Sequence, residues 1–226
     1  LIKDNGRGIP IDFHPKFKNK RALEIVLSTL HAGGKFDSNS YKTSGGLHGV
    51  GISVVNALSS SLQVTVFKNS KKYSQKYSKG KVKSKIKIEK CKKNEKGTEI
   101  IFIPDESIFE TIKFSPKKLY DFIKMKAVLV SGTSIDFKID KELIVDSTPS
   151  YEKFYFKNGI ADYLDIKNKN SVKLFDKQFS IVNKINDTEK CEIFISFNQS
   201  EKSSLLSFCN TIETPDGGSH ENGFKN

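Results

Sequence analysis

The feature that most constrains this chain is the stretch SGGLHGVG at residues 44–51, in which four of eight residues are glycine. It runs directly into an apolar pattern that predicts a helix over Val50–Leu58. The first amides of a helix have no partner within it, and the helix dipole favours negative charge there by about 0.3–2 kcal/mol. The stretch therefore predicts either an anion-binding cage, with amides near Gly49, Val50 and Gly51, or a tight turn that packs a helix on a sheet.

The spacing of these glycines excludes two common phosphate-binding loops. A P-loop places Lys and then Ser or Thr after its last glycine, whereas Ile52 and Ser53 follow Gly51. A Rossmann turn has the pattern GxGxxG directly after a strand, whereas this stretch reads GxxGxG after a polar loop. A phosphate site here has to be of another kind.

A second glycine-rich pattern, DNGRG, lies near the start of the sequence. Asp4 precedes Gly6 and Gly8, and the two glycines leave room for a flat ring beside the carboxylate. A buried carboxylate can accept a hydrogen bond from an exocyclic amino group, and a site built on that bond rejects ligands that lack the donor. Alone, the pattern is also common in surface turns. Together with the glycine-rich stretch about forty residues later, it predicts a site for a purine triphosphate.

Hydrophobic periodicity predicts an α+β fold, in which a helix layer packs on an antiparallel sheet. Helices are expected over Arg21–Leu30, over Gly159–Asp165 and after Ser115, which is a suitable N-cap before Pro116. Strands are expected at Leu62–Phe67, Lys81–Ile88, Thr98–Ile103, Thr133–Ile139, Glu142–Val145, Phe179–Asn183, Cys191–Asn198 and Leu205–Thr211.

The pattern changes near Ile166, where a polar stretch follows the last of these helices. We therefore predict two domains, 1–165 and 166–226. Three widely spaced cysteines, Cys91, Cys191 and Cys209, have no metal-ligand spacing and indicate reduced thiols. No apolar run approaches the roughly 20 residues that a membrane span needs.

The net charge of +12 is concentrated in one segment. Between Lys68 and Lys96 there are thirteen lysines but only two acidic residues, Glu89 and Glu95. Within it, residues 81–88 alternate between lysines on one face and apolar residues on the other, as in a half-buried strand. Two interpretations stay open: a solvated edge strand whose lysines prevent aggregation, or a surface that contacts DNA.

The motifs DNGRGIP, LHAGGKF, SGGLHGVG and VVNALS resemble the ATPase domain of the B subunits of bacterial type IIA topoisomerases, members of the GHKL (Bergerat-type) superfamily with Hsp90, histidine kinases and MutL. The resemblance covers essentially the whole chain. HPKF, KMKAVLVSG and CNTIETPDGGSHENG are more similar to the topoisomerase IV subunit (ParE) than to gyrase B (GyrB). The resemblance implies a GHKL sandwich of helices on a mixed, mostly antiparallel sheet over 1–165. It also implies the start of a ribosomal-S5-like transducer domain over 166–226.

The resemblance also implies an ATP site. Asp4 is expected to bind the adenine amino group, with Thr98 beside the same carboxylate. Gly8, Ile9 and Pro10 are expected to line the base pocket. Lys35 and Tyr41 are expected in a lid that closes over the nucleotide. The backbone amides of Leu47–Gly51 are expected to hold the phosphates, with His48 in a backbone or packing role. The implied ATP-binding residues are Asp4, Gly6, Gly8, Ile9, Pro10, Lys35, Tyr41, Gly46, Leu47, His48, Gly49, Val50, Gly51 and Thr98.

By the same resemblance, the family's catalytic glutamate and Mg²⁺-binding asparagine lie on a helix upstream of DNGRG, and a lysine that reaches the γ-phosphate lies downstream of Asn226. We therefore expect an internal fragment that contains no catalytic or metal-ligating residue. Removal of a positioned base alone costs about 10²- to 10⁴-fold in rate. The expected result is weak nucleotide binding and no hydrolysis by the fragment alone.

The implied full enzyme is a cytoplasmic, nucleoid-associated topoisomerase that uses ATP and Mg²⁺ to drive DNA strand passage. Its implied partners are DNA, an A-type subunit (ParC, or GyrA for a gyrase) and a second copy of the B subunit in a homodimer. Three alternatives are weighed against it: the B subunit of gyrase, a non-enzymatic lysine-rich DNA-binding module, and a histidine kinase or chaperone ATPase of the same superfamily.

Overall fold

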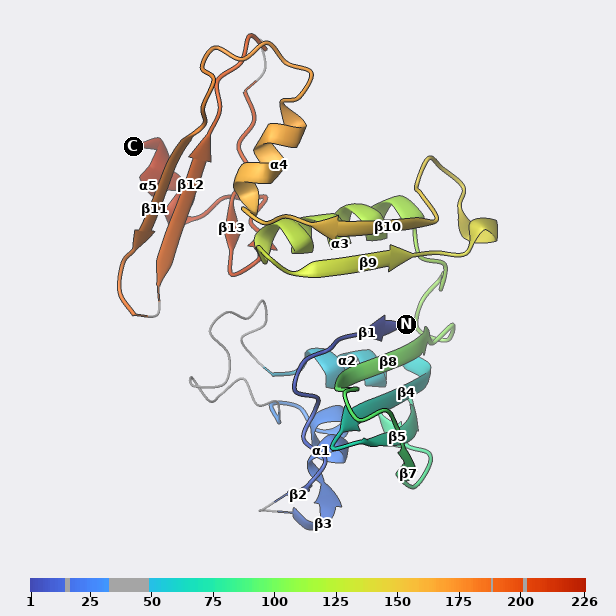
Figure 1. Ribbon diagram of the computed structural model, residues 1–226. Coiled ribbons are helices and arrows are strands. Elements are labelled where there is room, and N and C mark those ends of the chain that lie inside the picture. The colour runs from blue at the N-terminus through green and yellow to red at the C-terminus, as the bar shows by residue number, and fades with distance from the viewer. Residues whose placement is uncertain (15–16, 33–48, 188, 201–202) are drawn as a thin grey trace. The chain divides into compact units, whose positions relative to one another are not determined.

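The computed structural model describes residues 1–14, 17–32, 49–187, 189–200 and 203–226 (Figure 1). The chain divides into two compact units, Leu1–Lys113 and Phe114–Asn226. This division does not coincide with the domain boundary predicted near Ile166. A compact unit is defined by its internal contacts, whereas a domain is an inherited segment, so the division into 1–165 and 166–226 stays a prediction.

The first unit is built on a six-stranded sheet in the order β1-β8-β4-β5-β6, with β7 also paired to β5. Every one of these pairings is antiparallel. A separate two-stranded sheet joins β2 (Phe13–His14) to β3 (Phe17–Arg21). The six strands are β1 (Ile2–Lys3), β4 (Ser59–Lys68), β5 (Lys71–Ser78), β6 (Lys81–Val82), β7 (Lys87–Lys90) and β8 (Gly97–Pro104).

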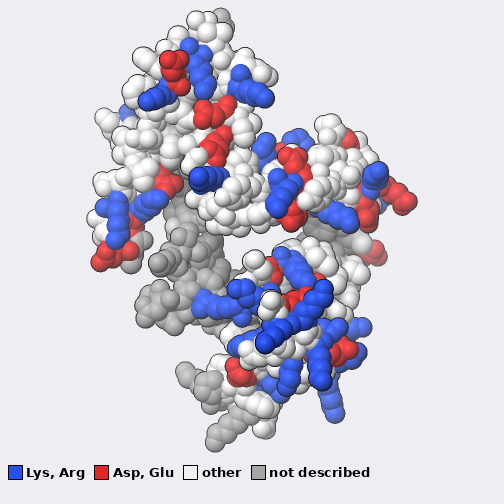
Figure 2. Space-filling model, viewed as in Figure 1, with Lys and Arg blue, Asp and Glu red and all other residues white. Residues whose placement is uncertain are grey.

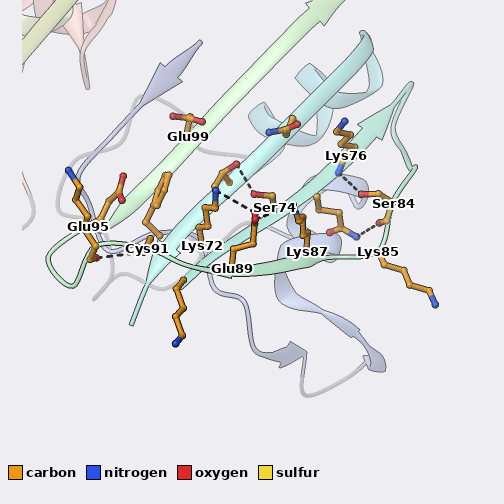
Figure 3. Close-up of a pocket in the computed structure, with 16 residues that line it drawn as sticks. Lys72, Ser74, Lys76, Ser84, Lys85, Lys87, Glu89, Cys91, Glu95 and Glu99 are labelled. Atoms are coloured by element: carbon orange, nitrogen blue, oxygen red, sulfur yellow. Dashed lines mark hydrogen bonds and ion pairs between the residues drawn. The ribbon is translucent and has the colours of Figure 1, made fainter. Parts of the chain in front are cut away.

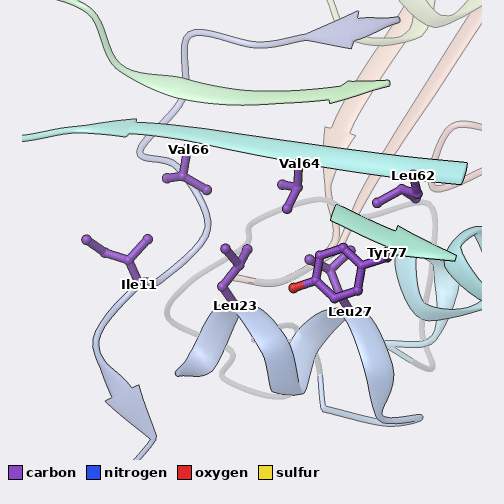
Figure 4. Close-up of a cluster of buried hydrophobic side chains, with 7 residues drawn as sticks. All are labelled: Ile11, Leu23, Leu27, Leu62, Val64, Val66 and Tyr77. Atoms are coloured by element: carbon purple, nitrogen blue, oxygen red, sulfur yellow. The ribbon is translucent and has the colours of Figure 1, made fainter. Parts of the chain in front are cut away.

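Two short helices, α1 (Ala22–Ser28) and α2 (Gly51–Ala57), form the helix layer of this unit. Leu23 and Leu27 are four residues apart, so they lie on one face of α1, and both are fully buried. Figure 4 shows them pointing at Val64 and its neighbours on the sheet. Burial of these side chains is the main force that holds the helix on the sheet. The buried cluster consists of Ile11, Leu23, Leu27, Leu62, Val64, Val66 and Tyr77.

Buried polar groups fix how the helices lie on the sheet. The Gln75 side chain donates to Glu24 of α1 over 2.7 Å and accepts from the Tyr77 hydroxyl over 2.7 Å. Burial, with a smaller contribution from the Glu24 charge, raises the pKa of Tyr77, so its hydroxyl keeps its proton. Asn56 of α2 donates to the Leu27 carbonyl over 2.8 Å. These bonds require one register of α1 against β5 and of α2 against α1.

The second unit has its own core beneath α3 (Pro116–Leu129). The predicted N-cap is confirmed, because the Ser115 side chain accepts from the Lys118 amide over 3.4 Å. The apolar side of α3 packs on the antiparallel pair β9 (Ser134–Lys138) and β10 (Tyr151–Tyr155). The remaining elements are η2 (Lys141–Leu143), α4 (Ile160–Lys167), the pair β11 (Phe179–Lys184) and β12 (Lys190–Ile195), the pair β13 (Phe208–Cys209) and β14 (Ile212–Glu213), and α5 (Ser219–Lys225).

Three strand predictions are wrong. The segment 81–88 is not one strand: it bends at Ser84, whose hydroxyl accepts from the Lys76 amide over 3.0 Å, so a side chain takes the place of a backbone ladder bond. The segment predicted at Glu142–Val145 is instead the 3₁₀ turn η2. Of Leu205–Thr211, only Phe208–Cys209 forms a strand, β13, and it ends at a turn in which Asn210 and Thr211 have φ angles of 48° and 73°.

Truncation of Leu27 tests the first core. Leu27→Ala leaves a cavity beneath β4 and is expected to lower the unfolding free energy of the first unit by about 2–5 kcal/mol. Leu30→Ala is the control: Leu30 is 59% exposed, and its loss is expected to change that free energy by less than about 0.5 kcal/mol. Amide hydrogen exchange of β4 measures both. Equal effects of the two changes would contradict the core described above.

Candidate nucleotide-binding site

Pairing of β1 with β8 brings together the two residues expected at the adenine end of the site. Ile2 lies opposite Ile100 and Lys3 opposite Glu99. The Asp4 amide continues this ladder and donates to the Thr98 carbonyl over 2.9 Å. Asp4 and Thr98 are 94 positions apart in the sequence, so their contact is a product of the fold.

The Asp4 carboxylate is anchored through one of its two oxygens. Oδ1 accepts from the Gly6 amide over 2.7 Å and from the Thr98 amide over 3.3 Å. Within the described part of the chain, Oδ2 has no hydrogen-bond partner. The Thr98 hydroxyl accepts from the Ile9 amide over 3.2 Å and ties the next turn to β8. The result is a fixed carboxylate with one oxygen left to accept from a ligand.

Asp4 is exposed, whereas the sequence predicted a buried carboxylate; that expectation is wrong for this structure. The physical reason is the place of β1 at the edge of the sheet, where no described strand lies beyond it. Thr98, by contrast, is 5% exposed, because it lies on an inner strand. The carboxylate is held firmly by backbone amides, yet it is open to solvent on its other side.

Close backbone approach explains two glycines at this joint. Gly97 has a φ angle of +116°, and a Cβ on it would lie 1.9 Å from the Asp4 carbonyl oxygen. Gly8 has a φ angle of +75°, and a Cβ there would lie 2.9 Å from Val66 Cγ1. The space at Gly8 is therefore filled by the sheet itself. Sequence reasoning missed Gly97, although a glycine directly before Thr98 was a visible signal.

The joint lies on the side of the sheet that faces the helices. Thr98 is paired with Val66, whose side chain is part of the core beneath α1. Ile9 packs against the same core, while Pro10 is exposed. The adenine end of the predicted site is thus on the helix side of β8.

The start of α2 is also described, and its predicted helix is confirmed as Gly51–Ala57. Gly49 has a φ angle of 62°, and a Cβ on Gly51 would meet no atom of the described residues within 4 Å. No side chain caps the helix at Val50. Among the described residues, no side chain accepts from its first amides, as an anion-binding turn requires. The expected phosphate-binding residues Lys35, Tyr41, Gly46, Leu47 and His48 lie outside the described residues.

Two family models match the chain. Residues 1–108 match the model for histidine kinase-, DNA gyrase B- and HSP90-like ATPases, and residues 159–226 match the model for DNA gyrase B. The B subunit of DNA topoisomerase 4 from Rickettsia bellii is 46% identical over 227 residues, which are 99% of this chain and 34% of that protein. The chain belongs to the family of topoisomerase IV and gyrase B subunits.

Further relatives agree with this assignment. The topoisomerase 4 B subunit of Caulobacter vibrioides is 40% identical over 99% of this chain and 33% of its own length. For the DNA gyrase B subunit of Mycoplasma genitalium the identity is 39%, over 100% of this chain and 35% of the relative. The chain thus spans about a third of the length of the curated relatives that it matches.

Solved structures of this family share the fold. The 43K ATPase domain of Thermus thermophilus gyrase B, solved with an aminocoumarin, has a TM-score of 0.78 at 30% identity and covers 99% of this chain and 55% of its own. The topoisomerase IV ATP-binding domain of Francisella tularensis, solved with a small-molecule inhibitor, has a TM-score of 0.70 at 27% identity. The match covers 99% of this chain and 56% of that domain's chain. The predicted α+β fold of the GHKL type is confirmed.

Gly97→Ala tests the joint between β1 and β8. An alanine there is strained by its positive φ and overlaps the Asp4 carbonyl, so we expect β1 to separate from β8 at a cost of more than about 1 kcal/mol. The Asp4 amide should then lose its protection from hydrogen exchange. Gly51→Ala is the control for stability, since its Cβ would meet no atom of the described residues within 4 Å. Full protection of Asp4 in the Gly97 variant would show that the close approach is not required.

Proposed function

We propose that this chain is the ATP-binding part of the B subunit of a type IIA topoisomerase, in which ATP binding and hydrolysis drive the passage of one DNA segment through another. The observation that supports this most is the Asp4 carboxylate, held by two amides with one oxygen free. Family membership adds the second support, because the matched relatives carry this segment within their own sequences. The activity of the whole protein is part of the proposal.

In the proposed site, Asp4 Oδ2 accepts a hydrogen bond from the exocyclic amino group of adenine. Its partner Oδ1 stays on the amides of Gly6 and Thr98, which fix the direction of the free oxygen. A carboxylate is only an acceptor, so it favours adenine, which has an amino group at C6, over guanine, which has a carbonyl there. The preference for ATP thus depends on the charge and orientation of one side chain.

For the phosphates, we propose the amides of Leu47–Gly51, with Lys35 and Tyr41 in a lid that closes over the nucleotide. The lack of any described atom within 4 Å of a Cβ on Gly51 is consistent with this role. The described residues hold no group of three His, Cys, Asp or Glu side chains suited to a metal ion. We propose that Mg²⁺ accompanies ATP in this site.

Within the family, we propose topoisomerase IV. The Rickettsia bellii topoisomerase 4 relative is 46% identical, against 39% for the Mycoplasma genitalium gyrase relative. The partners in this proposal are DNA, a ParC-type A subunit and a second copy of the B subunit, in the cytoplasm at the nucleoid. Gyrase B, with a GyrA-type partner, is the alternative, favoured by the TM-score of 0.78 to a gyrase B structure. Among the described helices, none combines the length and apolar character of a membrane span.

Asp4→Asn tests the adenine contact in the 226-residue chain. The amide keeps the size of the carboxylate but replaces a charged acceptor, so we expect ATP affinity to fall by about 10- to 100-fold. The asparagine amino group can donate to the guanine carbonyl, so GTP affinity should fall less, and the preference for ATP over GTP should shrink. NMR titration with each nucleotide measures both affinities, including weak ones.

Glu99→Gln is the matched control. Glu99 is next to Thr98 on β8, but its side chain points to the opposite face of the sheet, so ATP affinity should be unchanged. If Asp4→Asn and Glu99→Gln have equal effects on ATP binding, the proposed adenine contact is wrong.

A further inference from the structure

A polar groove of about 760 Å³ lies on the face of the first unit's sheet that points away from the helices (Figure 3). Side chains alternate along β4: Leu62, Val64 and Val66 enter the core, so the side chains between them face outward. The floor of this outer groove includes Thr65 and Ser74, whose hydroxyls are hydrogen-bonded over 3.1 Å. The groove is separate from the proposed nucleotide site, which is on the helix side.

Lysines dominate the lining of the outer groove. Figure 3 shows Lys76 and Lys85 toward one end, Glu89 between Lys72 and Lys87 in the middle, and Glu95 and Glu99 toward the other end. The lining includes six lysines and three glutamates, which are Lys72, Lys76, Lys85, Lys87, Lys90 and Lys92, and Glu89, Glu95 and Glu99.

The net positive charge of the protein comes entirely from the unit that carries this groove. Leu1–Lys113 has 20 lysines and 2 arginines against 10 acidic residues, a net charge of +12, whereas Phe114–Asn226 has 16 lysines against 16 acidic residues. Figure 2 shows many blue Lys and Arg side chains on the visible face of the first unit. Counting only described partners, nine of the thirteen lysines between Lys68 and Lys96 have no carboxylate within 4.0 Å.

We propose that the outer groove binds the phosphate backbone of duplex DNA. A concave, polar surface with lysines along it fits a cylindrical polyanion, and neutralisation of phosphates by lysine releases counterions, which drives binding. This proposal concerns a different face from the nucleotide site and is tested without nucleotide. Its failure therefore leaves the proposed ATP contact untouched.

The composition of the lining favours duplex DNA over other polyanions. Phe67 is the one aromatic residue among the described lining residues and is 6% exposed, so bases have no exposed ring to stack on, as single strands require. Amphipathic membrane-binding surfaces combine lysines with exposed apolar side chains, and the described lining lacks exposed apolar side chains. Contact with the backbone of an intact duplex needs neither feature.

Glu89 opposes DNA binding in this groove. Its carboxylate lies 3.1 Å from Lys87 Nζ and 3.4 Å from Lys72 Nζ. The hydrogen bond from Lys87, followed by that from Lys72, lowers the pKa of Glu89, so it is ionised at neutral pH. The Glu89 carboxylate forms ion pairs with two lysines of the groove, Lys72 and Lys87, and repels phosphate. Neutralisation of Glu89 should therefore strengthen DNA binding, an effect that a purely structural role would not produce.

The test is fluorescence anisotropy of a labelled 20-base-pair duplex with the full 226-residue chain, without nucleotide, between 50 and 200 mM salt. The variant combines Lys76→Gln, Lys85→Gln and Lys90→Gln, three lysines of the lining with no described carboxylate partner. We expect the affinity to fall by about tenfold or more. The slope of log K against log salt should fall by about 0.9 for each lost phosphate contact.

The matched control removes the same charge from the neutral second unit, through Lys138→Gln, Lys153→Gln and Lys157→Gln, all exposed. It should change affinity and slope much less than the groove variant. Glu89→Gln should raise the affinity by a few fold.

Equal losses in the groove variant and its control, or no gain from Glu89→Gln, would overturn the proposal. Tighter binding of a single-stranded oligonucleotide, of vesicles with anionic lipid or of an acidic peptide would overturn the assignment to duplex DNA.

Discussion

The hydrogen bonds between Asp4 and Thr98 are the constraint on which the proposed nucleotide site depends. They join an edge strand of two residues to the inner strand β8, and they exist only because Gly97 lets the two backbones approach. The same bonds orient the carboxylate, since one oxygen is held by amides and the other is left open. One contact thus couples the assembly of the sheet edge to the chemistry of adenine recognition.

The alternation of side chains along one sheet separates two kinds of surface. Residues such as Val66 and Thr98 point to the helices, where the apolar core and the Asp4 joint lie. Their neighbours on the same strands, such as Thr65 and Glu99, point to the outer groove with its lysines. Because the period of a strand is two, each face can change in sequence without disturbing the other. In this account a nucleotide and a nucleic acid use opposite faces of one sheet.

Elements with apolar periodicity were predictable from the sequence, and those that depend on distant partners were not. The core pattern of β4 and the capped helix α3 are local signals, and both were found. The strand β5 was missed, because its inward side chains include Gln75, whose burial is possible only through its bonds to Glu24 and Tyr77. The exposure of Asp4 and the bend at Ser84 likewise depend on which strands lie beside them. The resemblance of the motifs predicted that Thr98 lies beside Asp4, but it did not predict that Asp4 follows a strand at the edge of the sheet.

The central claim is that Asp4 contacts adenine through its free oxygen. A crystal structure of the chain with a non-hydrolysable ATP analogue measures this most directly. The account predicts the adenine amino nitrogen about 2.7–3.2 Å from Asp4 Oδ2, with Oδ1 still on the Gly6 and Thr98 amides. A purine bound elsewhere on the chain, with Asp4 Oδ2 still facing solvent, would contradict it.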